Sequence, residues 1–169
     1  MFQNLKKIFL GLLGLFFTKI ALALPADNEQ TLHIVADSSS MNYKSGVNVH
    51  EGNVKADQGT THLTADKIVT KNNAQHKIEE GIAYGLTRLA EYTTIPKPGD
   101  LLFRAKAKVM RFYPLKSIII LEGDVEVTQG ENSFNGSVII YNTKDQIITA
   151  PPSKGGRATI VIEPNKLKS

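Results

Sequence analysis

Apolar and polar residues alternate along most of the chain with a period of two. The alternation begins near Leu32 and recurs in pairs such as Val54 with Ala56 and Val125 with Val127. Alternation over about four to eight residues is typical of β-strands that bury one face. Turn-forming segments separate the alternating stretches, at residues 44–46, 57–59, 71–73, 128–130, 142–145 and 154–156. Short strands with evenly spaced turns predict an all-β fold.

The strand pattern also repeats. Residues Val49–Gly59 align with Ile120–Gly130 at a constant offset of 71 residues, and the glycine of each Glu-Gly-[Asn/Asp]-Val segment predicts a bulge or bend. Equivalent apolar positions mark four units of about thirty residues, at Ile34, Leu63, Phe103 and Phe134, with extra residues within 86–99. Because each unit must stack on its neighbours to bury its apolar face, the repeat predicts an elongated, curled roll of antiparallel strands with open ends.

Alternate residues of such strands point into the roll. Two interpretations of the inward residues stay open: they fill a dry core, or they line a groove whose Ile, Val, Phe and Met side chains would suit acyl chains. The predicted inward set, which is also the candidate lipid groove, comprises Ile34, Ala36, Met41, Tyr43, Val49, Val54, Leu63, Ile68, Ile78, Ile82, Tyr84, Phe103, Ala105, Met110, Phe112, Ile118, Ile120, Val125, Val127, Phe134, Ile139, Tyr141 and Ile148.

The first and last strands are predicted to end the stack with unpaired backbone groups. They lie at about 32–37 and 157–163, and the segment from Ala158 to Ile162 contains no charged residue that would discourage pairing. Head-to-tail pairing between copies follows as a contact that can propagate. The predicted edge residues are Leu32, Ile34, Ala36, Ala158, Ile160 and Ile162.

The first residues have the pattern of an export signal. Lys6 and Lys7 precede an apolar run that ends at Phe17, and Ala21-Leu22-Ala23 is a small-x-small site. A retained membrane anchor is the alternative, but the apolar run is short, whereas a spanning helix needs about 20 apolar residues. We therefore predict cleavage after Ala23 and a periplasmic location, with residues 1–23 as signal peptide, 24–30 as a flexible arm, 31–164 as one domain and 165–169 as a polar tail.

Composition narrows the function classes. Removal of residues 1–23 takes three of the 20 Lys and Arg and none of the 16 Asp and Glu, so the exported chain is nearly neutral and a nucleic-acid partner is not expected. The chain has no cysteine, which excludes a disulfide framework and a lipid-modified cysteine anchor.

No arrangement of residues points to catalysis. The four histidines, His33, His50, His62 and His76, have no partners at metal-ligand spacing. The carboxylates Glu51, Glu80 and Glu122 occupy equivalent positions of the repeat, so they are interpreted as turn residues rather than as an acid–base pair. We predict no catalytic residues, no metal site and no cofactor, and the protein is not expected to be an enzyme.

The chain resembles the OstA-like periplasmic proteins of lipopolysaccharide export, in particular the soluble bridge component of that system, its A subunit. The resemblance runs from Thr31 to Pro164 and is carried by the order and spacing of five segments, which are Ile34-Val-Ala-Asp37, Glu51-Gly-Asn-Val54 with Gln58-Gly59, Leu63-Thr-Ala-Asp-Lys-Ile68, Ile120-Leu-Glu-Gly-Asp-Val125 with Gln129-Gly130, and Lys154-Gly-Gly-Arg157.

The resemblance implies a twisted β-jelly-roll that binds the lipid A acyl chains of lipopolysaccharide in its groove. It also implies head-to-tail homo-oligomers that link an inner-membrane anchored complex to an outer-membrane translocon, with the lipid moving passively and an ATPase elsewhere driving it. Two further hypotheses stay open from the residues: a structural β-roll assembly protein with a dry core, and the membrane-anchored relative of the same export system.

Overall fold

The computed structural model describes residues 27–152 and 156–164, so the predicted signal peptide (1–23) and tail (165–169) lie outside the described residues. Within these ranges the chain forms strands and two short 3₁₀ turns, η1 (Asp27–Glu29) and η2 (Pro114–Lys116), and no helix there is long and apolar enough to cross a membrane. The all-β prediction is confirmed. The strands are β1 (His33–Val35), β2 (Ser38–Asn42), β3 (Val47–Gln58), β4 (Thr61–Asn72), β5 (Ile78–Tyr84), β6 (Ala90–Thr94), β7 (Phe103–Ala107), β8 (Val109–Tyr113), β9 (Ile118–Gln129), β10 (Asn132–Asn142), β11 (Ile147–Thr149) and β12 (Thr159–Val161).

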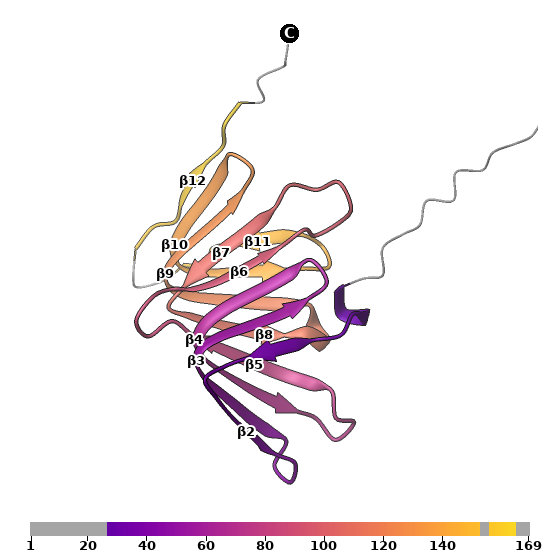
Figure 1. Cartoon of the computed structure of the whole chain (residues 1–169). Coiled ribbons are helices and arrows are strands. Elements are labelled where there is room, and N and C mark those ends of the chain that lie inside the picture. The colour runs from indigo at the N-terminus through magenta and orange to yellow at the C-terminus, as the bar shows by residue number, and fades with distance from the viewer. Residues whose placement is uncertain (1–26, 153–155, 165–169) are drawn as a thin grey trace, which may run out of the picture.

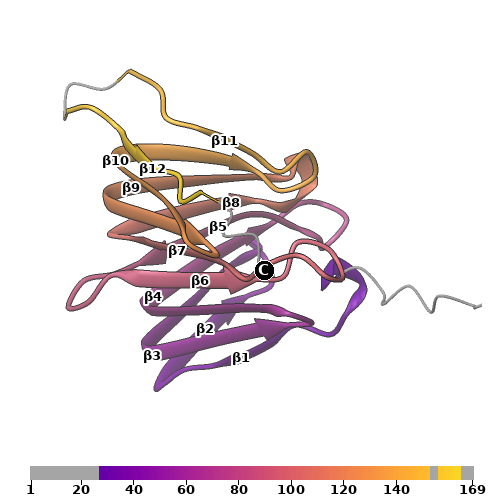
Figure 2. The same cartoon turned by 90° about the horizontal axis from the view of Figure 1, so that it is seen from above.

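The strands form one antiparallel sheet that folds over into two facing layers. β3, β4, β9 and β10 are long and run through both layers, whereas each short strand belongs to one. The first layer, which we call layer A, has the order β1-β3-β4-β6-β7-β9-β10-β12. The second, layer B, has the order β2-β3-β4-β5-β8-β9-β10-β11. The strands stack in chain order from the indigo end to the yellow end, which gives an elongated, open-ended roll (Figures 1 and 2).

A β-bulge marks the place where the long strands pass from one layer to the other. In β3 the pairing with β4 skips from Glu51 to Val54, and the two residues between, Gly52 and Asn53, have φ of 78° and 45°. At the offset of 71 residues, Gly123 and Asp124 of β9 have φ of 78° and 50°. Glycine and asparagine tolerate this left-handed backbone, so the predicted bend is confirmed.

Backbone hydrogen bonds tie the short strands to the same corner. The N–H of Asp37 donates to the carbonyl of Gly52 at 3.0 Å, and at the same offset the N–H of Lys108 donates to the carbonyl of Gly123 at 2.9 Å. The repeat therefore places the passage from β1 to β2 and the passage from β7 to β8 on one line along the roll. Each repeat unit consists of three successive strands. Our expectation that all strands are short was wrong, because β3, β4, β9 and β10 are long.

The core lies between the two layers. Its fully buried side chains come from both of them and from most of the strands, and the largest are Phe103, Met110, Leu121, Ile139, Val54 and Val127. The residues that mark the four units, Ile34, Leu63, Phe103 and Phe134, all face this core from layer A. This arrangement is the one that the repeat predicts, because each unit buries its apolar face only against its neighbours.

Candidate functional site

The interior of the roll is hollow toward its N-terminal end. An apolar cavity of about 150 Å³ lies between layers A and B there. Its walls come from β1, β3, β4, β5, β6 and β8, so residues far apart in sequence meet in one space. They are Leu32, Ile34, Ala56, Gln58, Thr61, Leu63, Ile68, Thr70, Ile78, Gly81, Tyr92, Phe112 and Pro114. A cavity lined in this way can accept an apolar group without leaving polar atoms unpaired.

The hollow opens along one long side of the roll, which we call the mouth. On the layer A side the mouth is bordered by the β3–β4 turn and the connection 95–102, and on the layer B side by η2 and the β10–β11 turn. The open space here has a volume of about 750 Å³, and Tyr92, Phe112 and Pro114 border both this space and the inner cavity. The cavity is therefore reached from the mouth, and Lys97 and Lys144 stand on opposite sides of the entrance.

Most of the predicted inward residues face the hollow or the core. Each is buried, packs against the buried cluster or lines the cavity. They are Ile34, Ala36, Val54, Leu63, Ile68, Ile78, Phe103, Ala105, Met110, Phe112, Val125, Val127, Phe134, Ile139, Tyr141 and Ile148. Their position inside the roll is confirmed, whereas contact with a lipid stays a prediction.

Five predicted inward residues face outward instead. In each case both neighbours along the strand are buried, or the pairing puts the residue on the outer face, since directly opposed residues share a face. They are Val49, Ile82, Tyr84, Ile118 and Ile120, of which Ile118 also borders the open space at the mouth.

The error has a physical cause at the corner. In β4 the side that faces the interior changes from Leu63 and Ala65 to Ile68 and Thr70. In β3 the bulge adds one residue at the corner, so the even-numbered positions face inward on both sides of it. Asn48 and His50 therefore face inward and Val49 does not. The outward aliphatic residues pack on one another across strands, as in the ladder Val49–Val69–Ile82. Hydrophobicity alone therefore indicated the wrong face.

Two other predicted groove residues are exposed. Met41 pairs with the buried Asn48, so it lies on the inner face, but β2 is the last strand of layer B and Met41 is 55% exposed. Tyr43 lies beyond the end of β2 in the turn to β3 and is 86% exposed. Both residues therefore belong to the N-terminal end of the roll rather than to the wall of its hollow.

Buried polar side chains, which the sequence pattern did not predict, also face the interior. Asn48 Nδ2 donates to Thr70 Oγ1 at 3.2 Å, and Ser39 Oγ lies 2.9 Å from His50 Nδ1. Because each group has a partner, its burial next to apolar residues costs little. The inward position of Asn48 and His50 follows from the bulge in β3 together with the change of inward side in β4. Both features depend on how the two strands pair at the corner, which the sequence pattern alone does not show.

We expect the stability of the protein to fall as the pH drops below the ordinary histidine pKa of 6.5, with His50 as a cause. Burial lowers the pKa of His50 below that value, so the unfolded chain binds a proton more readily than the folded chain until the pH falls below the lowered pKa. His50→Gln removes the titration and should flatten the dependence of the urea-unfolding free energy on pH. His76→Gln, at an exposed histidine in a turn, is the control. Parallel pH profiles of the wild type and His50→Gln would contradict the prediction.

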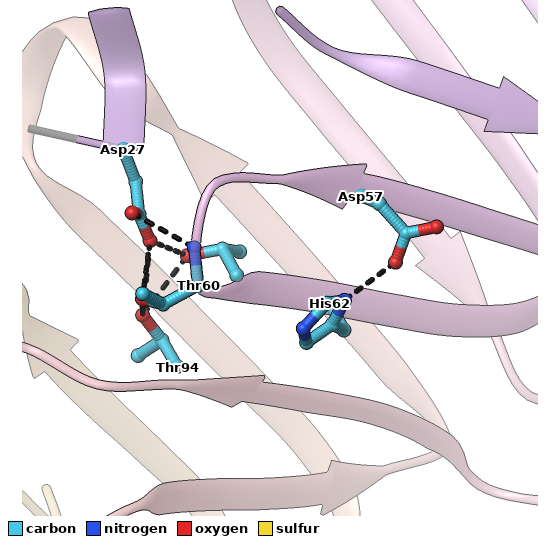
Figure 3. A network of polar contacts seen from close by, with 6 residues as sticks. Asp27, Asp57, Thr60, His62 and Thr94 are labelled. Atoms are coloured by element: carbon cyan, nitrogen blue, oxygen red, sulfur yellow. Dashed lines mark hydrogen bonds and ion pairs between the residues drawn. The ribbon is translucent and has the colours of Figure 1, made fainter. Parts of the chain in front are cut away.

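A hydroxyl cluster at the mouth surrounds Asp27 (Figure 3). Its carboxylate accepts hydrogen bonds from the N–H of Thr60 at 2.9 Å, from Thr60 Oγ1 at 2.8 Å and from Thr61 Oγ1 at 2.6 Å. Thr94 Oγ1 of β6 is 3.4 Å away. Partial burial acts to raise the pKa of Asp27, but these hydrogen bonds outweigh it and lower the pKa. The described part of the predicted flexible arm is thus fixed to the β3–β4 turn, which differs from the expectation.

Replacement of Asp27 by alanine should destabilise the protein by about 1–2 kcal/mol, since hydrogen bonds to a carboxylate are lost while the carboxylate is only partly buried. The stabilisation from Asp27 is present above pH 3.8, the unfolded value, and should be lost as the pH falls through the lowered folded pKa. Asp57→Ala is the matched control, because Asp57 makes one exposed contact with His62 at 2.6 Å (Figure 3). An exposed pair contributes less than about 1 kcal/mol. Urea unfolding should therefore rank Asp27→Ala as the more destabilised variant.

The remaining polar residues do not assemble a chemical site within residues 27–152 and 156–164. His33, His62 and His76 are exposed, and His33 and His62 lie on either side of Asp57 across neighbouring strands. No group of three His, Asp or Glu side chains in these ranges could hold a metal ion. Glu51 and Glu122, at equivalent positions of the repeat, pair with Lys67 at 2.7 Å and with Arg111 at 3.0 Å on the outer face.

Exposed apolar side chains gather at both ends of the roll. At the N-terminal end these are Leu32, Val35, Met41 and Tyr43, and at the C-terminal end Ile147, Ile160, Val161 and Ile162. Among the predicted edge residues, Leu32, Ala158, Ile160 and Ile162 are exposed, whereas Ile34 and Ala36 are half-buried because they face the hollow. Each end combines unpaired strands with apolar surface, which is typical of a site for strand addition.

The fold and the hollow together define an open-ended β-jelly-roll with an apolar interior, a class of protein suited to holding an apolar ligand. The chain belongs to the family described as LptA/(LptD N-terminal domain) LPS transport protein, which matches residues 33–147. This is a family of transport proteins rather than of enzymes, and the resemblance seen in the sequence is confirmed.

Similar proteins come from several bacteria. The lipopolysaccharide export system protein LptH of Pseudomonas aeruginosa is 31% identical over 98% of this chain and 97% of its own length. LptA of Escherichia coli K12, also described as a lipopolysaccharide export system protein, is 29% identical over 88% of this chain and 79% of its own. The crystal structure of LptH from P. aeruginosa, described as the LptA-homologous periplasmic component of the transport device, superposes with a TM-score of 0.75 over 83% of this chain and 100% of that structure.

Proposed function

We propose that this protein is a periplasmic carrier that binds lipopolysaccharide in its apolar hollow and passes it from the inner toward the outer membrane. The observation that carries the proposal is the hollow, which is apolar inside and open along the mouth, in a chain whose relatives are lipopolysaccharide export proteins. A dry core, the alternative, would be packed shut, since protein interiors leave few voids larger than a water molecule. The cavity therefore favours the carrier.

The geometry suggests how an amphiphilic lipid would lie. Acyl chains would enter between layers A and B, where Ile34, Leu63 and Ile68 offer apolar contact. The sugar and phosphate groups would stay at the mouth, where Lys97 and Lys144 supply cations. This division keeps every charged group of the lipid in water.

The two ends of the roll support assembly into a bridge. β1 and β2 end the layers at the N-terminal end, and β12 and β11 end them at the C-terminal end. If the C-terminal end of one copy adds to the N-terminal end of the next, both layers continue and so does the hollow between them. The same ends would join the inner-membrane anchored and outer-membrane components of the machinery. Export with cleavage after Ala23 completes the proposal.

Charge placed in the hollow should abolish lipopolysaccharide binding, whereas charge on the outer face should not. Leu63→Lys puts an ammonium group at the cavity wall close to the mouth, where the long side chain can reach water and leave the fold intact. Thr64→Lys is the matched control, because Thr64 faces outward between Lys55 and Glu91. Binding of fluorescent lipopolysaccharide is measured beside circular dichroism. A folded Leu63→Lys variant with unchanged affinity, or a wild type that binds none, would refute the carrier.

A further inference from the structure

A row of aromatic rings crosses the interior of the roll. Tyr141 from layer B stacks on Phe103 from layer A with a centroid distance of 4.2 Å and an interplanar angle of 13°. Phe103 meets the edge of Tyr92 at 6.2 Å, and Tyr92 meets Phe112 of layer B at 5.7 Å. The rings thus connect the two layers at two places. Phe103 and Tyr141 are only 1% and 3% exposed, so the stacked pair lies deep between the two layers.

A polar contact bridges the mouth beside the stacked pair. Gln146 Nε2, in the β10–β11 turn of layer B, donates to Asp100 Oδ2, in the connection 95–102 of layer A, at 2.9 Å. We call this hydrogen bond the clasp. Burial raises the pKa of Tyr141 to about 12, and the charges of Tyr92 and Asp100 add to the rise. The effect of Asp100 agrees with a carboxylate held close to the stacked rings.

The ring row limits the apolar cavity on its C-terminal side. On its N-terminal side lies the apolar cavity, for which Tyr92 and Phe112 form a wall. On its C-terminal side lie Val127 of β9 and Phe134 of β10 in layer A and Ile148 of β11 in layer B, which pack in the interior. A ligand that moves between the layers from the cavity toward the C-terminal end therefore passes the rings.

Two related segments of the repeat border the mouth, and the clasp occurs in the second of them. The connection 95–102 overlaps the segment 86–99, in which the sequence predicts extra residues. Its Leu101 lies over Gly130 as Asp27 lies over Gly59, the equivalent glycine 71 residues earlier. Asp27 binds Thr60 and Thr94, which belong to its own layer. Asp100 instead reaches across to the opposite layer. Only the second of these two related segments spans the mouth.

We propose that the Phe103–Tyr141 stack, held by the Asp100–Gln146 clasp, is a gate between the apolar cavity and the C-terminal part of the interior, and that acyl chains pass it only when the clasp opens. This inference rests on the proposed function. Both clasp residues lie in connections between strands, so the mouth can widen here while the strand ladders stay paired. The clasp is a single hydrogen bond between half-buried groups, which is weak enough to open without unfolding.

The test links the clasp covalently. The chain has no cysteine, so Asp100→Cys with Gln146→Cys provides a single pair of thiols for a short bismaleimide linker. A photoreactive phenylalanine analogue replaces Ile34 on the N-terminal side or Phe134 on the C-terminal side. Lipopolysaccharide is added to the full exported chain, and adduct formation is followed over time. We expect linking to leave the adduct at position 34 unchanged and to slow the adduct at position 134 severalfold.

Two controls isolate the gate. The pair Ser117→Cys with Thr143→Cys takes the same linker within layer B, where Thr143 Oγ1 donates to the Ser117 carbonyl at 3.3 Å, and does not span the mouth. The Asp100 and Gln146 cysteines capped with a monofunctional maleimide control for modification alone. If the linked clasp leaves the rate at position 134 unchanged, or both controls slow it equally, the gate is refuted. Absence of adducts at both positions in the unlinked protein would instead refute the proposed function.

Discussion

Replacement of Gly85 by alanine should destabilise the protein by about 3 kcal/mol or more, among the largest effects of any single methyl group in the chain. Gly85 lies between β5 and β6, where the chain passes from layer B to layer A. A Cβ atom at this position would overlap with the carbonyl oxygen of Arg88 and the amide nitrogen of Ala90. Both are backbone atoms, and the Gly85 N–H is itself bound to the Lys108 carbonyl at 2.8 Å, so the corner cannot relax without losing its hydrogen bonds.

Gly81→Ala is the matched control and should have the opposite sign. Gly81 lies in β5 and borders the cavity, and the nearest atoms to an added Cβ belong to Phe112 at 3.8 Å and 3.9 Å. These are ordinary contacts, and alanine in a strand is favoured over glycine by about 0.5–1 kcal/mol. Urea unfolding of the two variants therefore tests the corner geometry directly. Similar unfolding free energies for Gly85→Ala and Gly81→Ala would show that the backbone around Gly85 has room for a Cβ atom.

The fold was predictable from the sequence because local patterns repeat. Period-two alternation gave the strands, and the recurrence of Glu-Gly-Asn-Val and Glu-Gly-Asp-Val located the bulges at Gly52 and Gly123. Four units marked by Ile34, Leu63, Phe103 and Phe134 gave the stacking. What alternation could not show is that four strands run through both layers, since that depends on pairing between distant segments rather than on any residue within the strand.

The lining of the site was predictable away from the corner and not at it. Val125 and Val127 lie after the β9 bulge and within layer A, so simple alternation places both on the inner face, as the structure has them. Val49 lies before the bulge of β3 and Ile120 before that of β9, and both were assigned to the wrong face. The polar residues Asn48 and His50 took the inward places because partners on neighbouring strands satisfy them. The clasp between Asp100 and Gln146 left no local signal, since it joins two turns 46 residues apart.

Blocking either end of the roll should abolish self-assembly, and mixing the two blocked forms should restore a dimer and nothing larger. Val35→Lys with Met41→Lys charges the N-terminal end, and Ile147→Lys with Ile160→Lys charges the C-terminal end. All four residues are exposed, so the substitutions should leave the fold intact, while lysine on an edge strand opposes strand addition. Each variant alone should stay monomeric at concentrations where the mass of the wild type rises.

The mixture separates a head-to-tail contact from a symmetric one. In a head-to-tail contact the two surfaces differ, so each blocked variant keeps the surface that the other lacks, and one contact forms between them before both remaining ends are blocked. In a symmetric contact between like ends, one of the two variants would still dimerise alone, because its functional end is intact. Leu86→Lys, at an exposed apolar residue beside the corner and away from both ends, is the control and should assemble like the wild type. Sedimentation velocity of the two variants, their equimolar mixture and the control distinguishes these cases, and a monomeric mixture would exclude end-to-end assembly through these strands.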